Sequence, residues 1–548
     1  MIGDGMGFNH VDAASLYDHG TTNWQITGEP GSDITKQDGY GANPSQVYER
    51  FDVQLALSHH SLDSPAYDGD DAWADFDWAK DRPTDSAASG TALTTGIKTH
   101  NGYLGVDGDK KTVANVAEHA HETGRATGVV SSVPFGHATP ASWGAHVASR
   151  GENHKIAEQM ISSDLDVIMG AGHPKFDDDA QPRDPQWDWL TEEQYTGLQA
   201  DDAARAFVED SAGIEAIARG EDVPEKLFGL APVAETLQFN RSSLEDTEPR
   251  NSNGGREDGT PIDGDAPLPG DATPNDVVSL ENMSSAALNV LSQDEDGFFT
   301  MIEGGAIDWA GHANATTGNL EEMEDFNNSV EAAHDWVEKN SSWDETLLIV
   351  TADHETGYLS GPSDDKHWTP MTGESGSLPV DGWYSPEHTN HLVPFFAHGA
   401  GADAINGYVR GTDPVRGDYI DNTDVAKLAY DLWQEKADDG PSEDPTEGPS
   451  EEPSDEPSEE PSEEPSERPS EEPSDAPSEQ PSDEPTDRDD DGSGRDDKDG
   501  RDDNAGKDDR GGNLPRTGAE LGAAGAIAAG LVALGSTAVF LARRRRQN

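Results

Sequence analysis

Asp85 and Ser86 are the adjacent residues whose types and position most directly suggest chemistry. They open a run of small residues that predicts a helix over 86–95, with Asp85 as its N-cap. The first turn of a helix presents free N–H groups and a partial positive charge, both of which favour a phosphate group. Ser86 could therefore attack a phosphorus atom if the chain supplies a group that activates its hydroxyl. The alternative is a helix cap without chemistry.

Polar residues also follow several short apolar runs of the kind that form buried strands. Asp4 follows residues 1–2, Glu303 follows 298–302, and Asp353 with His354 follows 347–351. In open α/β sheets, ligands bind beyond the carboxyl ends of the strands. Each residue alone would read as a turn or a cap, whereas three acids at three strand ends indicate one site.

Two further motifs offer metal ligands. Asp308 and His312 are four residues apart, so they share one face of a helical turn, where they could hold a metal or form a salt bridge. The segment 387–391 supplies two more imidazoles, His388 and His391. The chain has no cysteine, so any zinc must be held by histidine and carboxylate ligands.

The elements that must position these residues alternate along the chain. We expect strands at 126–133, 165–169, 297–302, 346–351 and 393–397, and a long helix at 320–338. Strands that alternate with helices predict an α/β fold, with a central, mostly parallel sheet flanked by helices on both faces. Two polar, turn-rich stretches, 174–188 and 244–276, are expected to be surface insertions, and the second could cover a site.

The charge of the chain limits its partners. The net charge is −74 at pH 7 over 548 residues. An acidic surface of this strength repels nucleic acid and anionic membranes, so no nucleic acid partner is expected. A phosphate site must then be made locally positive by metals, arginine or helix ends. A solvated surface suited to high salt explains the charge better than recruitment of a basic partner.

The C-terminal fifth differs in composition from the rest. We divide the chain into a catalytic domain at 1–438, a linker at 439–513 and a terminal signal at 514–548. The linker is rich in Pro, Ser and Glu and then in Asp and Gly, which predicts a disordered, extended stalk. The signal combines Leu514-Pro515-Arg516-Thr517-Gly518, an apolar run at 521–542 and four arginines.

This three-part signal resembles the sorting signal of Gram-positive surface proteins. The resemblance implies that a sortase cuts between Thr517 and Gly518 and joins the protein to peptidoglycan. A bilayer-length apolar run before a basic end fits that order. We therefore expect an extracellular, cell-wall-anchored protein. The sequence starts with two residues of an apparent buried strand and lacks a secretion signal, so we expect the true start to lie upstream, beyond a signal peptide.

Residues 1–430 resemble the alkaline phosphatase family. The resemblance rests on seven blocks in the family's order, which are Ile2–Gly7, Thr84–Ser89, Ala138–Pro140, Ser149–Arg150, Ile302–Gly304 with Asp308 and His312, Thr351–His354, and Glu387–Thr389. It implies two zinc ions and one magnesium ion. Asp308, His312 and His388 would hold the first zinc, and Asp353, His354, Asp4 and Ser86 the second. Asp4 would bridge to a magnesium that Glu303 and Thr139 also bind.

The resemblance further implies a role for each remaining site residue. Arg150 would clamp two phosphate oxygens as a bidentate fork, and Asp85 would position it beside the substrate. His391 would lie beside the metals without binding them, although the sequence alone could exchange it with His388. His137 and Trp309 stand where an Asp and a Lys often occur. Both would lie near the metals or their waters. The loss of a carboxylate and an ammonium there means that the magnesium affinity and the pH optimum do not follow from the resemblance.

The function expected from these residues is broad-specificity hydrolysis of phosphate monoesters through a phosphoserine at Ser86, for phosphate scavenging outside the cell. A metal that lowers the proton affinity of Ser86 would make a general base unnecessary. Phosphoryl transfer depends more on charge stabilisation and alignment than on covalent help. The alternatives are a phosphodiesterase or phosphonate hydrolase on the same scaffold, and a surface adhesin that uses the fold for display. A homodimer is possible, since dimers are common in the family.

Overall fold

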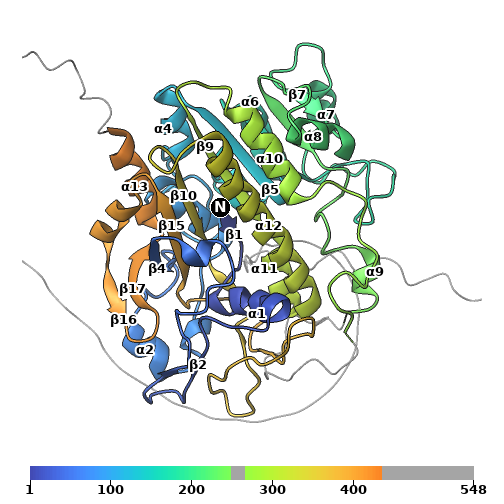
Figure 1. Cartoon of the computed structure of the whole chain (residues 1–548). Coiled ribbons are helices and arrows are strands. Elements are labelled where there is room, and N and C mark those ends of the chain that lie inside the picture. Colours follow the sequence, from blue (N-terminus) through green and yellow to red (C-terminus); the bar gives the residue numbers. More distant parts are fainter. Residues whose placement is uncertain (249–265, 435–548) are drawn as a thin grey trace, which may run out of the picture. The chain divides into compact units, whose positions relative to one another are not determined.

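A computed structural model of the chain describes residues 1–248 and 266–434. Within that part, the fold is built on one eleven-stranded sheet of strand order β16-β17-β4-β15-β10-β1-β9-β5-β6-β8-β7 (Figure 1). Its strands are β1 (Ile2–Gly3), β4 (Val53–Ser58), β5 (Ala126–Pro134), β6 (Val167–Ala171), β7 (Ala206–Val208), β8 (Leu227–Leu230), β9 (Phe298–Gly304), β10 (Leu347–Thr351), β15 (Val393–Gly399), β16 (Gly411–Asp413) and β17 (Gly417–Asp421).

The strands from β10 to β7 all run parallel, because each is reached through a crossover that contains a helix or a long loop. Strand β15 runs antiparallel to both β10 and β4, and β16 forms an antiparallel pair with β17 at one edge. The central sheet is thus mixed and mostly parallel. This confirms the fold class expected from the sequence.

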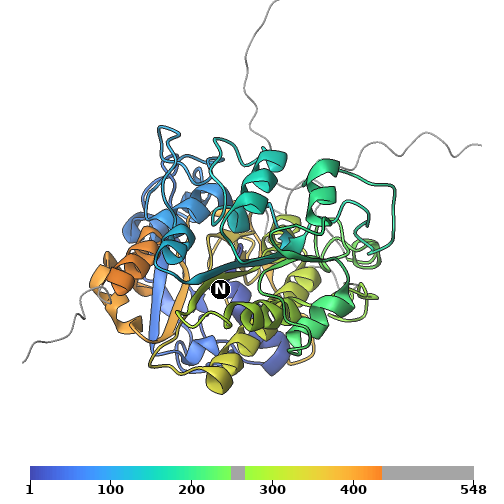
Figure 2. The ribbon, with the colours of Figure 1, turned by 90° about the horizontal axis from the view of Figure 1, so that it is seen from above.

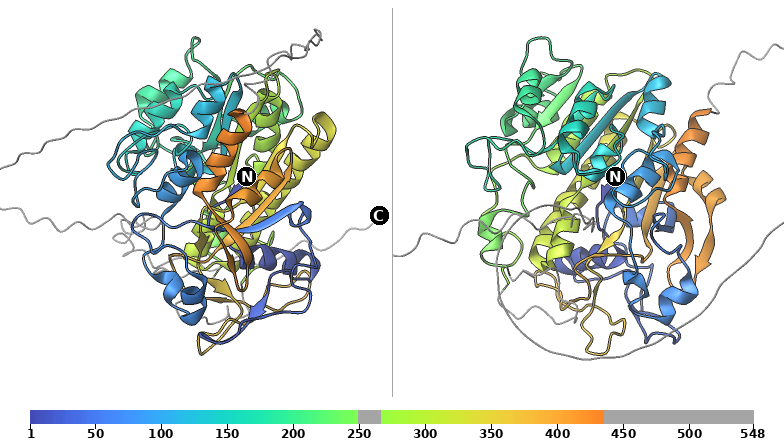
Figure 3. Two further views of the ribbon diagram at one scale, coloured as in Figure 1. Left: turned by 90° about the vertical axis from the view of Figure 1, so that its left-hand side faces the viewer. Right: turned by 180° about the vertical axis from the view of Figure 1, so that it is seen from behind.

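Helices cover both faces of the sheet (Figure 2). They are α1 (Phe8–His19), α2 (Gly69–Ala74), α3 (Ser86–Thr95), α4 (Val116–Glu122), α5 (Ala138–Ala141), α6 (Asn153–Ser162), α7 (Glu192–Leu198), α8 (Ser211–Ala218), α9 (Ser242–Glu245), α10 (Leu280–Leu291), α11 (Ala306–Ala313), α12 (Thr316–Asn340) and α13 (Thr423–Gln434). Short 3-10 turns lie at Tyr48–Arg50, Trp78–Lys80 and Ala402–Tyr408. Figure 3 shows α13, in dark orange, near β17.

The strands supply two hydrophobic cores because successive side chains point to opposite faces. In β5, Val130 joins the core that includes α10 and α12, whereas its neighbour Val129 joins the core that includes α4 and α6. In β6, Val167 and Ile168 divide in the same way. A sheet buried on both faces explains why its strands read as continuous apolar runs in the sequence.

Short two-stranded pairings close the loops near the ends of β1 and β10. They join β2 (Ile26–Thr27) with β3 (Thr35–Lys36), β11 (Glu355–Thr356) with β14 (His388–Thr389), and β12 (Leu359–Ser360) with β13 (Gly382–Trp383). The β11–β14 pair brings residues 355–356 next to 388–389, which lie more than thirty positions later in the chain. This pairing places the segment of His388 against the segment of His354.

The elements expected from the sequence are present with small shifts. The helix over 86–95 has the predicted ends, and the helix over 320–338 lies inside the longer α12. Of the two expected insertions, 174–188 forms turns and one isolated bridge, and 244–276 is described only in part. The linker and the signal with Thr517 and Gly518 lie outside the described residues. Every helix in 1–248 and 266–434 is too short or too polar to cross a bilayer.

Candidate metal centre and nucleophile

The carboxyl ends of three adjacent parallel strands meet at one point. Strand β1 lies between β9 and β10, with Ile2 in register with both Glu303 and Thr351. The residues that follow or end these strands, Asp4, Glu303 and Asp353, are therefore brought to one level and are fully buried. The sequence expectation that three acids at three strand ends share a site agrees with this placement.

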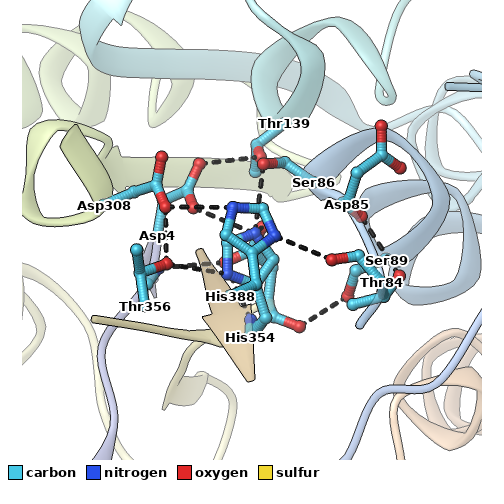
Figure 4. Close-up of polar contacts among 12 residues, drawn as sticks. Asp4, Thr84, Asp85, Ser86, Ser89, Thr139, Asp308, His354, Thr356 and His388 are labelled. Atoms are coloured by element: carbon cyan, nitrogen blue, oxygen red, sulfur yellow. Dashed lines mark hydrogen bonds and ion pairs between the residues drawn. The ribbon is translucent and has the colours of Figure 1, made fainter. Parts of the chain in front are cut away.

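Asp4, Asp353 and His354 form the first group of candidate metal ligands. The Nε2 atom of His354 lies 3.1 Å from Oδ2 of Asp353 and 3.4 Å from Oδ1 of Asp4. The hydroxyl of Ser86 lies 3.1 Å from the same Nε2 atom (Figure 4). One cation near this nitrogen would contact two carboxylates, one imidazole and the serine oxygen.

Asp308, His354 and His388 form the second group, which shares His354 with the first. His312 lies beside Asp308 and His388 but is not itself in a group. Oδ1 of Asp308 lies 3.3 Å from Nε2 of both His312 and His388, and these two Nε2 atoms are 3.2 Å apart. The helical spacing of Asp308 and His312 on α11 therefore produces a shared face, as expected. The ring of His388 stacks on that of His354 with centroids 3.6 Å apart.

Backbone carbonyls orient two of these imidazoles. Nδ1 of His312 lies 2.5 Å from the carbonyl oxygen of Pro386, and Nδ1 of His388 lies 2.7 Å from that of Thr84. A carbonyl can only accept, so each neutral ring carries its proton on Nδ1. When the rings are neutral, as metal ligands must be, each Nε2 lone pair then faces Asp308. A second hydrogen bond that fixes the ring in this way is typical of histidines that bind metals.

Asp4, His137 and Glu303 form a third group. Thr139 donates a hydrogen bond to Oδ2 of Asp4 over 3.3 Å, and Ser131 donates to Oε2 of Glu303 over 2.5 Å. His137 was expected beside the metals without binding them. The structure places one of its nitrogens close enough to Asp4 and Glu303 to act as a ligand itself.

The electrostatics of the protein alone favour a cation at this centre. Burial raises the pKa of Asp4 well above its ordinary value, with the charges of Asp353 and Asp308 adding to the effect. Burial also raises the pKa of Glu303 to about 8. One oxygen each of Asp4, Glu303 and Asp353 is buried with no hydrogen-bond partner. Buried carboxylate oxygens that accept no hydrogen bond are costly unless a cation neutralises them, so the donor set fits bound divalent metals.

Ser86 is the first residue of α3, and Asp85 caps that helix. Oδ1 of Asp85 accepts a hydrogen bond of 2.9 Å from the amide of Ala88, one of the first-turn amides that have no acceptor within the helix. Gly90 lets α3 approach α5, because a Cβ atom there would lie 2.9 Å from Oγ of Ser142. The run of small residues in α3 thus serves close packing and positions the hydroxyl.

Arg150 lies beside this helix start. Its guanidinium donates to Oδ2 of Asp85 and to Nε2 of His137, each over 3.2 Å. The side chains of Arg150 and Asp85 are each 15% exposed, whereas Ser86 is buried. Burial, together with the charge of Arg150, lowers the pKa of His137 to about 3, so its ring is neutral. Arg150 is therefore a partly open cation next to the serine, which suits a phosphate clamp.

Two other predicted residues lie farther from the cluster or at its edge. The ring of His391 packs against Tyr358 and Trp73, with centroids 4.8 and 5.6 Å away, and its carbonyl accepts a hydrogen bond from His59. Within the described residues, the ligand groups contain His388 and not His391, which favours the first of the two alternatives left open by the sequence. Trp309, on α11, meets the ring of His137 edge-on at 5.7 Å.

Sequence reasoning missed the residues that hold the site in place. Ser89 donates a 2.6 Å hydrogen bond to the carbonyl of Asp353, and thereby ties α3 to the end of β10. Asn101 accepts from the amide of Asp85 and donates to the carbonyl of Pro83. Thr356 donates to Asp308. No spacing signal distinguishes these residues, because each acts through contacts made between distant segments.

Comparisons with known proteins agree with the geometry. A family model described as alkaline phosphatase matches residues 74–380, and one described as PT disordered repeat matches 438–471. The chain is 33% identical over 292 residues to alkaline phosphatase 3 of Bacillus subtilis, which covers 52% of each chain. It is 28% identical over 444 residues to alkaline phosphatase of Escherichia coli, which covers 75% of this chain and 83% of the relative.

Solved structures include proteins of similar fold. The cold-active alkaline phosphatase of a Shewanella species matches with a TM-score of 0.53 at 23% identity, and covers 79% of this chain and 98% of the other. The aligned region spans about half the length of alkaline phosphatase 3. Streptomycin-6-phosphate phosphatase of Streptomyces griseus is 30% identical over 369 residues, with 75% of that protein covered.

Proposed function

The chain belongs to the alkaline phosphatase family, and we propose that it hydrolyses phosphate monoesters with Ser86 as the nucleophile. The observation that carries this proposal is the position of Ser86. Its hydroxyl lies at the start of α3, 3.1 Å from Nε2 of His354, with Arg150 beside it. A phosphate group spreads its charge over several oxygens. It therefore suits a site that combines a serine oxygen, an arginine and the amides of a helix start.

We assign the metals as the family resemblance implies. Asp308, His312 and His388 would hold one zinc ion, and Asp353, His354, Asp4 and Ser86 a second. Asp4, Glu303 and Thr139 would hold a magnesium ion, with His137 as a further nitrogen donor close to the last group. When bound, these ions lower the pKa of coordinated oxygens and neutralise charge on a transferring phosphoryl group.

The side chains and amides of the protein orient the substrate and accept the phosphoryl group. Arg150 and the amides at the start of α3 hold the non-bridging phosphate oxygens in line with Ser86. The oxygen of Ser86 forms a bond to phosphorus while the bond to the ester oxygen breaks, which leaves a phosphoserine and an alcohol. Water then displaces Ser86 and releases phosphate. Asp85 keeps both Ser86 and Arg150 in position, since its two oxygens contact the helix and the guanidinium.

Arg150 also decides between substrate classes. Its guanidinium would hold two non-bridging oxygens at once, and a monoester would still offer a third to the metals, whereas a diester has only two such oxygens in all. We therefore favour monoesters over diesters and phosphonates. The test compares turnover of an aryl phosphate monoester with that of the matching diester, before and after chelation. Chelator-sensitive turnover that favours the monoester is expected, and a preference for the diester would reject this assignment.

The location of the enzyme is proposed from the sequence alone. We infer that the Leu-Pro-Arg-Thr-Gly motif at 514–518 anchors the protein to peptidoglycan through Thr517, outside the cell, where it releases phosphate from organic esters. The adhesin alternative shares this location but has no use for a complete ligand set. Anchoring predicts that the protein is released from cell walls by a muralytic enzyme and not by detergent.

A further inference from the structure

Thr356 touches both imidazole and carboxylate ligands of the candidate metal centre without belonging to either ligand group. Its hydroxyl oxygen lies 2.5 Å from Oδ1 of Asp308 and 3.3 Å from Nδ1 of His354 (Figure 4). Asp308 belongs to the group assigned to the first zinc, and His354 to the group assigned to the second. Thr356 is therefore a single buried hydroxyl that contacts both groups.

The direction of the two hydrogen bonds follows from the number of protons. A threonine hydroxyl has one proton, and the shorter contact is to a carboxylate oxygen, which accepts. The proton of Thr356 thus points at Asp308, and its lone pair is left for His354. A neutral imidazole that contacts a lone pair must carry its own proton at that nitrogen, so Nδ1 of His354 is the donor.

The proton on Nδ1 determines that the opposite ring nitrogen, Nε2, can act as a metal ligand. With the proton on Nδ1, Nε2 of His354 keeps its lone pair, and this is the atom that lies 3.1 Å from both Asp353 and Ser86. His312 and His388 obtain the same tautomer from backbone carbonyls, which are permanent acceptors. His354 depends instead on a hydroxyl, which accepts in this geometry only while Asp308 takes its proton.

The surroundings of Thr356 hold this arrangement in place. Its amide donates a 3.1 Å hydrogen bond to the carbonyl of Gly5, and a Cβ atom at Gly5 would lie 2.9 Å from the Thr356 hydroxyl. A Cβ atom at Gly311 would lie 2.9 Å from the Thr356 carbonyl. Glycines at both positions therefore allow Thr356 to approach closely, and its β-branched side chain has few rotamers.

We propose that Thr356 is a positioning residue that fixes the tautomer of His354 and the orientation of Asp308 together, and so couples the two zinc groups. This inference rests on the proposed metal assignment. It predicts that removal of one hydroxyl weakens both zinc sites at once, although Thr356 binds neither ion. Loss of such an outer hydrogen bond typically costs about 10- to 100-fold in metal affinity.

The test measures zinc affinity by competition with a chromophoric chelator on metal-stripped full-length protein. Thr356→Val removes the hydroxyl at nearly constant volume, Thr356→Ala removes it with less steric risk should the valine variant not fold, and Thr356→Ser retains it. Thr351→Val is the matched control, because Thr351 is a buried threonine whose hydroxyl donates to the carbonyl of Pro394. The melting temperature of each stripped variant separates general destabilisation from an effect on the metals.

We expect both zinc dissociation constants to rise about 10- to 100-fold in Thr356→Val or Thr356→Ala, and to stay near wild type in Thr356→Ser and Thr351→Val. Unchanged zinc affinity in the variants without the hydroxyl would overturn the inference. Weakening of only one zinc would overturn the coupling. A wild-type protein that binds no zinc would instead reject the proposed function itself.

Discussion

At the scale of single residues, Asp85 carries two roles that can be separated. Its Oδ1 caps α3 through Ala88, and its Oδ2 accepts from Arg150 and from the amide of Gly102. One carboxylate thus fixes the helix that presents Ser86 and the guanidinium expected to hold phosphate. The sequence indicated the cap, whereas the contact with Arg150 depends on a segment sixty-five residues away.

Replacement of Asp85 should therefore affect catalysis more than folding. Asp85→Ala should cost about 1 kcal/mol of stability through the lost cap. It should also lower kcat/KM by about 10-fold or more, because a charge-assisted bond to Arg150 is lost. Asp210→Ala removes an equivalent cap from α8 and should cost similar stability with no effect on kcat/KM. Equal kinetic loss in both variants would show that Asp85 acts through stability alone.

At the scale of elements, close approach of α3 and α5 positions Ser86, the proposed nucleophile. Ala normally stabilises a helix relative to Gly by about 1 kcal/mol. Gly90→Ala should instead push α3 from α5, because its Cβ atom would lie 2.9 Å from Oγ of Ser142, and it should lower kcat about 10- to 100-fold. Gly197→Ala, on the open side of α7, should raise the melting temperature and keep kcat. Full activity in Gly90→Ala would refute this packing argument.

Helix α12 contains a carboxyl group that links stability to pH. Glu322 is buried, one of its oxygens has no hydrogen-bond partner, and burial raises its pKa to about 8. Because this pKa exceeds the ordinary value in the unfolded chain, the folded state binds the extra proton. The resulting stability is present below about pH 4.5 and is lost as pH rises through about 8.

Glu322→Gln should remove this dependence, since glutamine fills the same space without a charge. We expect the variant to melt at a higher temperature than the wild type at pH 9 and at a similar temperature at pH 5. Thermal unfolding followed across that pH range checks the difference. An equal slope of melting temperature against pH in both proteins would contradict the buried-carboxyl explanation.

Residues that follow a strand with a clear sequence pattern could be predicted as part of the site, whereas residues placed by tertiary contacts could not. Asp4, Glu303 and Asp353 follow apolar strands, so the rule that parallel strand ends meet was enough to group them. The choice between His388 and His391 required the β11–β14 pairing, which joins segments with no local signal. Thr356, Ser89 and Asn101 could not be found at all, because ordinary turns and helices contain such residues and only their tertiary contacts distinguish them.

At the scale of the whole molecule, the net charge of −74 should make stability depend on salt. Raising ionic strength from about 0.01 M to 1 M shortens the Debye length from about 30 Å to 3 Å, which screens repulsion between surface carboxylates. We expect the melting temperature and the activity to rise with sodium chloride over this range. Unchanged values would refute adaptation of the surface to high salt.

The central claim is that Ser86 carries the phosphoryl group during turnover. The most direct measurement is rapid acid quenching of the metal-loaded enzyme with a phosphate monoester, followed by peptide mass spectrometry. We predict phosphoserine at Ser86 in the wild type, and neither phosphoserine nor steady turnover in Ser86→Ala. Phosphate on another residue, or near-normal turnover by Ser86→Ala, would contradict the account.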